Sequence, residues 1–407
     1  MISIVSVSTL MTALGSTIPT PGVPQLMKEF HSDNDLLERF VISVYALGFA
    51  FGPLVIAPLS ETYGRLPVCL TCNLNFLIWC IACAIAPNMA ALVIFRFLAG
   101  AFGAAPFTLG GGTIADIVDP AQRGTAMGIW MGGLTVGPVI GPTFGGFISA
   151  YLGWRWTFWI LSIIAGVICG ISIIFMRETF ARVLLARKVQ QLRKESGNPD
   201  LKSRLDKEDS TAILLRLSFI RPAKMFFKSV MRVSTLHLCC YCLHYDVHGQ
   251  YGIPTSTSGL VYLGWGIGSI IGQATYTTVS NRFVARSIAK GTFKPEDRLP
   301  LIVPGGILLP IGLIWYGWSA QAEVHWIVPI IGTAVAAIGL TIVFVPVALR
   351  SLCAAVIPLR GQTLYDKLGI GWGNTLLALV VLGCIPITLV FYFYGERIRK
   401  RYPLVNL

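Results

Sequence analysis

The chain has 407 residues and a net charge of +13; 54% of its residues are hydrophobic and only 13% are charged. Soluble domains usually carry about 25% charged residues, and the mean hydropathy here is +0.69 over the whole length. These values exclude a soluble enzyme and indicate an all-α polytopic membrane protein. The positive charge predicts cytoplasmic loops rich in Lys and Arg, not a nucleic-acid partner.

Apolar runs of about 20 residues, the length that an α-helix needs to cross a bilayer, recur along the sequence. The long runs lie at about 2–18, 40–59, 68–87, 91–115, 125–150, 156–176, 259–280, 300–319, 325–345 and 372–394. Two weaker runs lie at 232–245 and 346–358, and each is well short of a full span. The sequence therefore predicts about 12 spans in two halves, with two of the spans incomplete.

Basic clusters set the predicted orientation. If every run crosses once and the N-terminus is inside, every basic cluster falls on the cytoplasmic side, as membrane proteins prefer. Arg65 and Arg123 lie in two such clusters. The predicted parts are an N-terminal six-helix bundle at 1–176, a cytoplasmic linker at 177–231 with one amphipathic helix at 182–193, a C-terminal six-helix bundle at 232–394 and a cytoplasmic tail at 395–407.

Four cysteines form a C-x2-C-x7-C-x2-C pattern that imitates a zinc site: Cys69, Cys72, Cys80 and Cys83. They lie in an apolar run without a charge, whereas zinc ribbons need loops and a longer gap between the pairs. Buried neutral thiols on a membrane helix explain them better. The His- and Cys-containing segment at 237–248 fixes no ligand geometry either. We expect no metal and no cofactor.

The stretch GGLTVGPVIGPTFGG at 132–146 places glycines and prolines inside an apolar run. On a helix, glycines four residues apart form a flat strip that lets another helix approach closely in lipid. The strip consists of Gly133, Gly137, Gly141 and Gly145, with Pro138, Pro142 and Gly146 beside it. The prolines predict a kinked helix, because neighbouring helices can cover the carbonyls that prolines leave unbonded. The alternative is a packing helix with no mechanistic role.

The stretch at 132–146 resembles the antiporter motif on the fifth helix of drug–proton antiporters in the major facilitator superfamily. Further segments are similar to signatures of the twelve-helix branch common in fungi, and the likeness runs almost end to end. These segments are APLSETYGRLP at 57–67, RFLAGAFGAAP at 96–106, GGTIADIVDPAQRGTAMGIW at 111–130, RETFARVLLARK at 177–188 and LYDKLGIGWGNTLL at 364–377.

The resemblance implies a conformational latch at the cytoplasmic ends of helices 2 and 4. Arg65 would pair with Asp116, Gly64 belongs to the same loop signature, and Glu61 would face the N-terminal end of helix 11. An Arg–carboxylate pair is strong and geometrically definite, so making and breaking it would bias inward against outward states. The alternative is that these charges only mark a solvated loop.

The resemblance also implies a role in proton coupling for Arg96, a charge within a predicted membrane helix. Such charges are costly in lipid and usually pair or face a cavity. The alternative is an arginine that snorkels to the outer interface. No acidic residue lies in the middle of a predicted span, so the residue that carries the proton stays unassigned.

A midplane cavity between the two bundles would bind the substrate. Aromatic, uncharged linings suit amphipathic organic molecules. The aromatic candidates are Phe107, Trp130, Tyr262, Trp265 and Tyr276. We expect a monomeric multi-pass protein of the plasma membrane, or of a vacuolar or vesicle membrane, that exports small organic compounds against protons. A nutrient uptake facilitator of the same fold, or a degenerate carrier that does not transport, remains open.

Overall fold

The structure is a computed structural model that describes residues 1–31, 35–119, 122–197, 262–289, 302–344, 369–379 and 381–383. Within these ranges the secondary structure is helical, and no strand occurs. The two weak apolar runs, the linker after residue 197 and the C-terminal tail lie outside the described residues. The incomplete helices 7 and 11 therefore stay a prediction.

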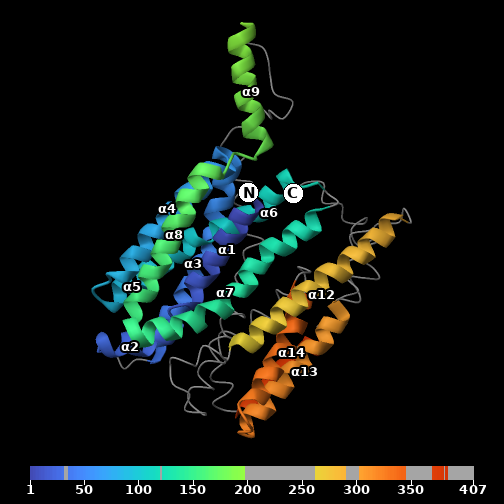
Figure 1. Ribbon diagram of the computed structural model, residues 1–407. Coiled ribbons are helices and arrows are strands. Elements are labelled where there is room, and N and C mark those ends of the chain that lie inside the picture. The colour runs from blue at the N-terminus through green and yellow to red at the C-terminus, as the bar shows by residue number, and fades with distance from the viewer. Residues whose placement is uncertain are drawn as a thin grey trace. The chain divides into compact units, whose positions relative to one another are not determined.

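The helices of the first half follow the predicted apolar runs. They are α1 (Ile2–Thr17), the 3-10 helix η1 (Thr20–Gly22), α2 (Val23–Glu29), α3 (Asp35–Tyr63), α4 (Arg65–Ala84), α5 (Met89–Gly103), α6 (Ala105–Ile117), α7 (Arg123–Leu152) and α8 (Trp154–Phe175). In Figure 1, α3, α4 and α8 run roughly parallel. The helix predicted at 182–193 is observed as α9 (Ala181–Ser196), which projects beyond the end of α8.

The fourth apolar run differs from its prediction as a single helix. It forms α5 and α6, which meet at Ala104. Pro106 lies in the first turn of α6, where a missing N–H costs nothing, but inside a continuous helix it would remove a hydrogen bond. By contrast, α7 continues through Pro138 and Pro142. The Asn88 side chain caps α5 at its start by accepting from the Ala91 N–H at 2.8 Å.

Six helical segments of the described chain are long and apolar enough to cross a bilayer. They are Ile2–Glu29, Phe40–Tyr63, Arg65–Ala84, Met89–Ile117, Arg123–Leu152 and Trp154–Phe175. The last of these exposes isoleucines and a valine on one face, with Ile163 at 60% and Ile174 at 74%. Exposure of these apolar side chains to water would be unfavourable, whereas contact with lipid tails is not.

The chain divides into two compact units, with boundaries inside α1, α3, α7 and α8. Unit 1 takes in Met1–Thr12, Val44–Gly133 and Phe158–Phe227, and unit 2 takes in Ala13–Ser43, Leu134–Thr157 and Lys228–Leu407. In unit 1, close packing of α3 on α5 depends on glycine. A Cβ on Gly48, Gly52 or Gly100 would meet backbone atoms of the facing helix, so these two helices approach to backbone contact.

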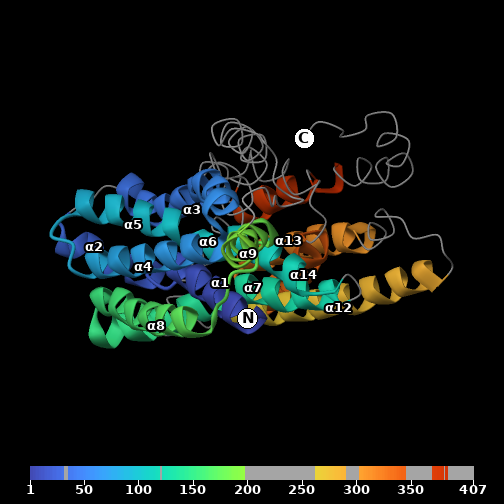
Figure 2. The same cartoon turned by 90° about the horizontal axis from the view of Figure 1, so that it is seen from above.

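In unit 2, α14 (Ile327–Phe344) packs against both α12 (Tyr262–Ala289) and α13 (Ile302–Gln321), and Figure 2 shows the three as neighbours. Here a second glycine strip occurs, which the sequence reasoning passed over. Gly264, Gly268 and Gly272 lie four residues apart on α12, and a Cβ on any of them would meet α14. Glycines thus allow close helix–helix contact both between α3 and α5 and between α12 and α14.

Candidate functional site

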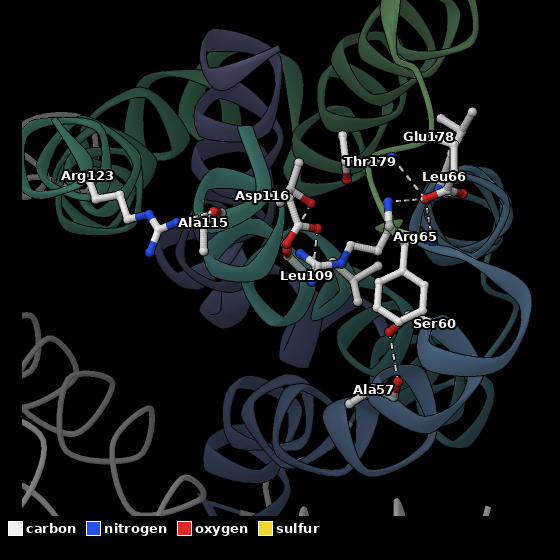
Figure 3. A network of polar contacts seen from close by, with 12 residues as sticks. Ala57, Ser60, Arg65, Leu66, Leu109, Ala115, Asp116, Arg123, Glu178 and Thr179 are labelled. Carbon is white, nitrogen blue, oxygen red and sulfur yellow. Dashed lines mark hydrogen bonds and ion pairs between the residues drawn. The ribbon is translucent and has the colours of Figure 1, made fainter. Parts of the chain in front are cut away.

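The predicted ion pair of the latch is formed in unit 1. Arg65 is the first residue of α4, and its Nη2 lies 3.1 Å from Asp116 Oδ2 at the end of α6 (Figure 3). Gly64, the residue before α4, has φ +101°, a conformation that glycine adopts without strain. The structure thus brings together three of the four predicted latch residues.

The guanidinium of Arg65 is closely confined. It lies 5.6 Å from the centre of the Phe180 ring, and a Cβ on Gly112 would collide with it. Arg65 Nη1 and Thr179 Oγ1 are buried without a hydrogen-bond partner in the described part of the chain. Both residues line a cleft together with Ser8 and Arg177. Arg65 therefore uses one terminal nitrogen for Asp116, while the other stays available as a donor.

Glu61, the fourth predicted latch residue, lies near the end of α3 and is exposed. Its expected partner, the start of helix 11, falls outside the described residues, so this contact stays a prediction. A neighbouring arginine, which sequence reasoning had assigned only to a basic cluster, has a definite place in the structure. Arg123 donates from Nε to the Val118 carbonyl at 2.9 Å and from Nη2 to the Ala115 carbonyl at 2.8 Å. It thereby closes the C-terminal end of α6 beside Asp116 (Figure 3).

Sequence reasoning missed Glu178, which lies at the same end of unit 1. Its carboxylate accepts from the backbone N–H groups of Arg65 and Leu66, both at 3.1 Å, and from those of Thr179 and Phe180, both at 3.0 Å. Orphan N–H groups at a helix start attract carboxylates. Only the resemblance of the segment at 177–188 marked this part of the sequence, and it gave Glu178 no role.

Arg96 on α5 is buried, with 2% of its surface exposed. Its guanidinium lies 5.4 Å from the centre of the Tyr45 ring and 5.7 Å from that of Phe158. The rings present π faces that stabilise a cation away from water. Tyr45 in turn donates from Oη to the Thr12 carbonyl at 2.9 Å. An arginine that snorkelled to the interface would end in solvent, and this one ends between aromatic rings.

Three glycines of the α7 strip face α1, and the fourth, Gly145, faces Ile18, the residue directly after α1. In unit 1, a Cβ on Gly133 would lie 2.6 Å from the Ser6 carbonyl oxygen. In unit 2, a Cβ on Gly137, Gly141 or Gly145 would collide with Ala13, Thr17 and Ile18 respectively. Pro138, Pro142 and Gly146 are also buried. The neighbouring Gly132 faces open space, so the closeness belongs to the strip itself.

The predicted aromatic residues form two groups, one in each unit. In unit 1, Phe107 stacks on Trp130 with ring centres 5.7 Å apart, and Trp130 donates from Nε1 to Thr9 Oγ1 at 2.9 Å. In unit 2, Tyr262 and Trp265 belong to one buried cluster that includes Val139. Tyr276 on α12 is also buried, at 7%. Their role in a substrate cavity stays a prediction.

The four cysteines of the zinc-like pattern all lie on α4 and are buried free thiols. Among the described residues, no group of three or more His, Cys, Asp or Glu side chains is placed to hold a metal ion. The pattern therefore reflects the buried face of a helix, because Cys69, Cys72, Cys80 and Cys83 recur close to whole numbers of helical turns.

A polar cluster in unit 2 was also missed. Glu29 at the end of α2 accepts from Trp154 Nε1 at 2.6 Å and forms an ion pair with Arg155. Phe30 lies edge-on against Trp154, with ring centres 5.9 Å apart. The cluster joins the segment after α1 to the start of α8. About 125 residues separate its members in sequence, so no local pattern signals it.

An all-α membrane fold with a charge pair beside the Gly64 turn and a glycine-lined helix contact is typical of a membrane transporter. The sequence model of the Major Facilitator Superfamily matches residues 5–379. The chain belongs to this superfamily, and it is a transporter rather than an enzyme.

Known proteins agree with this assignment. The MFS-type transporter tndD of Aspergillus flavipes is 42% identical over 437 aligned positions, which cover 98% of this chain and 81% of the relative. The efflux pump radE of Floropilus chiversii is 38% identical, covering 98% of this chain and 80% of the relative. The xylose transporter XylE from E. coli, in a partially occluded inward-open conformation, superposes with a TM-score of 0.65 at 15% identity, covering 97% of this chain and 98% of XylE. This likeness shows the fold of two six-helix bundles.

Proposed function

We propose that the chain exports small amphipathic organic compounds, in the class of drugs, toxins or secondary metabolites, by proton antiport and alternating access. The observation that carries the proposal is the contact of α7 with α1. Four glycines spaced four apart bring two helices to backbone contact, beside two buried prolines. A facilitator that only equilibrates a nutrient has no evident need for such a contact. The name of the relative radE, an efflux pump, supports the direction of transport.

Alternating access requires that one end of the transporter closes while the other opens. The Arg65–Asp116 pair at the predicted cytoplasmic end supports a latch for this step. The pair stabilises the state in which α4 and α6 are joined, and any state in which they separate must break it. Arg96, held between aromatic rings, is the proposed element of proton coupling, because a buried cation responds to any change of charge near it.

Purified protein in lipid vesicles with an imposed pH gradient and a fluorescent amphipathic dye tests the proposal. Gradient-driven dye movement that is lost in Gly137→Val and in Arg96→Ala is the expected result. Gly132→Val is the matched control, because Gly132 faces open space. Dye movement that ignores the pH gradient would instead identify a facilitator.

A second function has one specific observation in its favour, namely a chain that inserts in the membrane but transports nothing. The alignment with tndD spans 437 positions, more than the 407 residues of this chain, so the relative contains residues without a counterpart here. The two short apolar runs, at 232–245 and 346–358, are the natural places for such gaps. No dye movement in any vesicle, with the protein present in the membrane, is the result that supports this alternative.

A further inference from the structure

Glu178 lies at the junction of three segments that are far apart in sequence. It follows α8, it precedes α9, and its carboxylate reaches the turn between α3 and α4. Oε1 accepts from the N–H groups of Arg65, Thr179 and Phe180, and Oε2 accepts from that of Leu66 (Figure 3). One side chain thus satisfies two of the first N–H groups of α4 and also folds the start of the linker around itself.

The turn before α4 is shaped to admit this carboxylate. A Cβ on Gly64 would lie 2.5 Å from Glu178 Oε2, so a larger residue would displace the carboxylate, and the φ of +101° would strain it as well. Glycine at this position therefore serves two purposes, the turn itself and the space for Glu178. The family resemblance accounts only for the turn.

The linker also supplies the surface against which the latch arginine rests. Phe180, two residues after Glu178, presents its ring to the Arg65 guanidinium at 5.6 Å. The Phe180 N–H is itself held by Glu178 Oε1. Glu178 thereby fixes the backbone of Arg65 from one side and the ring that contacts its guanidinium from the other. The Arg65 side chain is therefore already oriented for its ion pair with Asp116, which lies 3.1 Å away.

We infer that Glu178 is a positioning residue of the latch, and that the start of the cytoplasmic linker is a working part of it. Glu178 does not contact Asp116; it acts through the backbone and the ring that orient Arg65. When the hydrogen bonds of Glu178 to the start of α4 break, the Arg65 side chain is no longer oriented toward Asp116. The linker then separates from α4 at the same time as the Arg65–Asp116 ion pair breaks. The functional consequence rests on the proposed transport cycle, whereas the geometric inference can be tested without it.

The charge of Glu178 and its acceptor oxygens predict different effects of substitution. If Glu178 acted through its negative charge on Arg65, any carboxylate at this position would serve. If it acted only as an acceptor of backbone N–H groups, reach and acceptor oxygens would matter and charge would matter less. Glutamine keeps one acceptor oxygen at full reach, while aspartate keeps the charge but is one methylene too short to span to α4. The inferred role therefore predicts the order Glu, then Gln, then Asp and Ala together.

Phenylglyoxal labelling of arginines, read peptide by peptide by mass spectrometry on the full-length protein in detergent, tests this order. Arg65 should label about three-fold faster or more in Glu178→Ala and Glu178→Asp than in the unchanged protein, with Glu178→Gln between them. Arg123 is the internal reference, because it lies at the same end but is held by the Val118 and Ala115 carbonyls. Glu195→Gln is the matched control, since Glu195 lies exposed on α9 and accepts from Gln191.

Three results would overturn the inference: an Arg65 rate that no variant changes, rates for Arg65 and Arg123 that rise together in Glu178→Gln, or Glu178→Asp that matches the unchanged protein. Vesicle transport gives a second readout, in which Glu178→Ala should lower kcat with little change in KM. If the unchanged protein moves no dye, the transport proposal fails, but the labelling result still decides the role of Glu178.

Discussion

Gly137 of α7 faces Ala13 of α1 so closely that a methyl group on Gly137 would collide with the Ala13 side chain. Helix propensity and packing therefore oppose each other at this position. Alanine favours a helix over glycine by about 1 kcal/mol, whereas overpacking costs about 1–3 kcal/mol. We expect Gly137→Ala to lower the thermal stability of the protein in detergent.

Gly132 provides the control for this prediction, since it lies on the same helix with open space around its Cα. Gly132→Ala should leave the stability unchanged or raise it. Thermal unfolding followed by intrinsic fluorescence compares the two variants directly. A Gly137→Ala protein as stable as Gly132→Ala would show that α1 and α7 do not depend on the close contact.

The Arg65–Asp116 pair should matter more for transport than for stability. The two side chains are 18% and 27% exposed, and exposed ion pairs contribute only about 0.2–1 kcal/mol. A bias of about 1 kcal/mol between two conformations nevertheless changes their ratio about five-fold. We expect Asp116→Asn to leave the melting temperature nearly unchanged and to change dye transport several-fold. Asp119→Asn, three residues on and exposed, is the control; equal effects of the two would exclude a specific pair.

Tyr45 separates the ring contact of Arg96 from its hydrogen bond. Tyr45→Phe keeps the ring at 5.4 Å from Arg96 and removes only the bond to the Thr12 carbonyl. Tyr45→Leu removes the π face, which stabilises a desolvated cation by about 2 kcal/mol. Transport should therefore survive in Tyr45→Phe and fall clearly in Tyr45→Leu, as measured by initial dye flux at a fixed pH gradient. Loss of transport in both variants would show that the Tyr45 hydroxyl, and not the ring, is needed for transport.

The Glu29–Trp154–Arg155 cluster should stabilise unit 2. Glu29→Ala removes the acceptor of Trp154 Nε1 and the partner of Arg155 together. Hydrogen bonds to charged groups contribute about 1.5–3 kcal/mol, and because Glu29 and Arg155 are partly exposed the expected loss is about 1 kcal/mol. Glu29→Gln should recover part of it, because its amide oxygen can still accept from the indole. Thermal unfolding measures both variants, with Lys28→Gln on the same helix as control; equal melting temperatures in all three would assign the cluster no energetic role.

The cysteines of α4 should be inert in the folded protein. All four are buried, from 1% exposure at Cys80 and Cys83 to 6% at Cys69. N-ethylmaleimide should therefore label them only after unfolding in denaturing detergent, and zinc should not protect them. Rapid labelling of the folded protein at Cys72 or Cys80, read by peptide mass, would show that the cysteine-bearing face of α4 is accessible to water.

The sequence predicted the membrane-length helices of the first half well, because each of these lies in an apolar run long enough to cross a membrane. The run at 91–115 is one span as predicted, but the sequence did not show its division into two helices, where α5 ends at Gly103 shortly before Pro106. The pairing of Arg65 with Asp116 was expected only through family resemblance. The bond of Glu178 to Arg65 joins residues 113 apart, and no periodicity reports a contact between the end of one helix and the start of another.

The close contact between α1 and the glycine strip of α7 limits where a transported compound could enter from the bilayer. Where two backbones touch, no gap remains for an acyl chain, and a flat hydrophobic molecule dissolved in the leaflet cannot slip between α1 and α7. The contact between α1 and α7 is therefore closed to such molecules along the glycine strip. If the proposed substrates enter from the bilayer, they would therefore have to pass between another pair of helices.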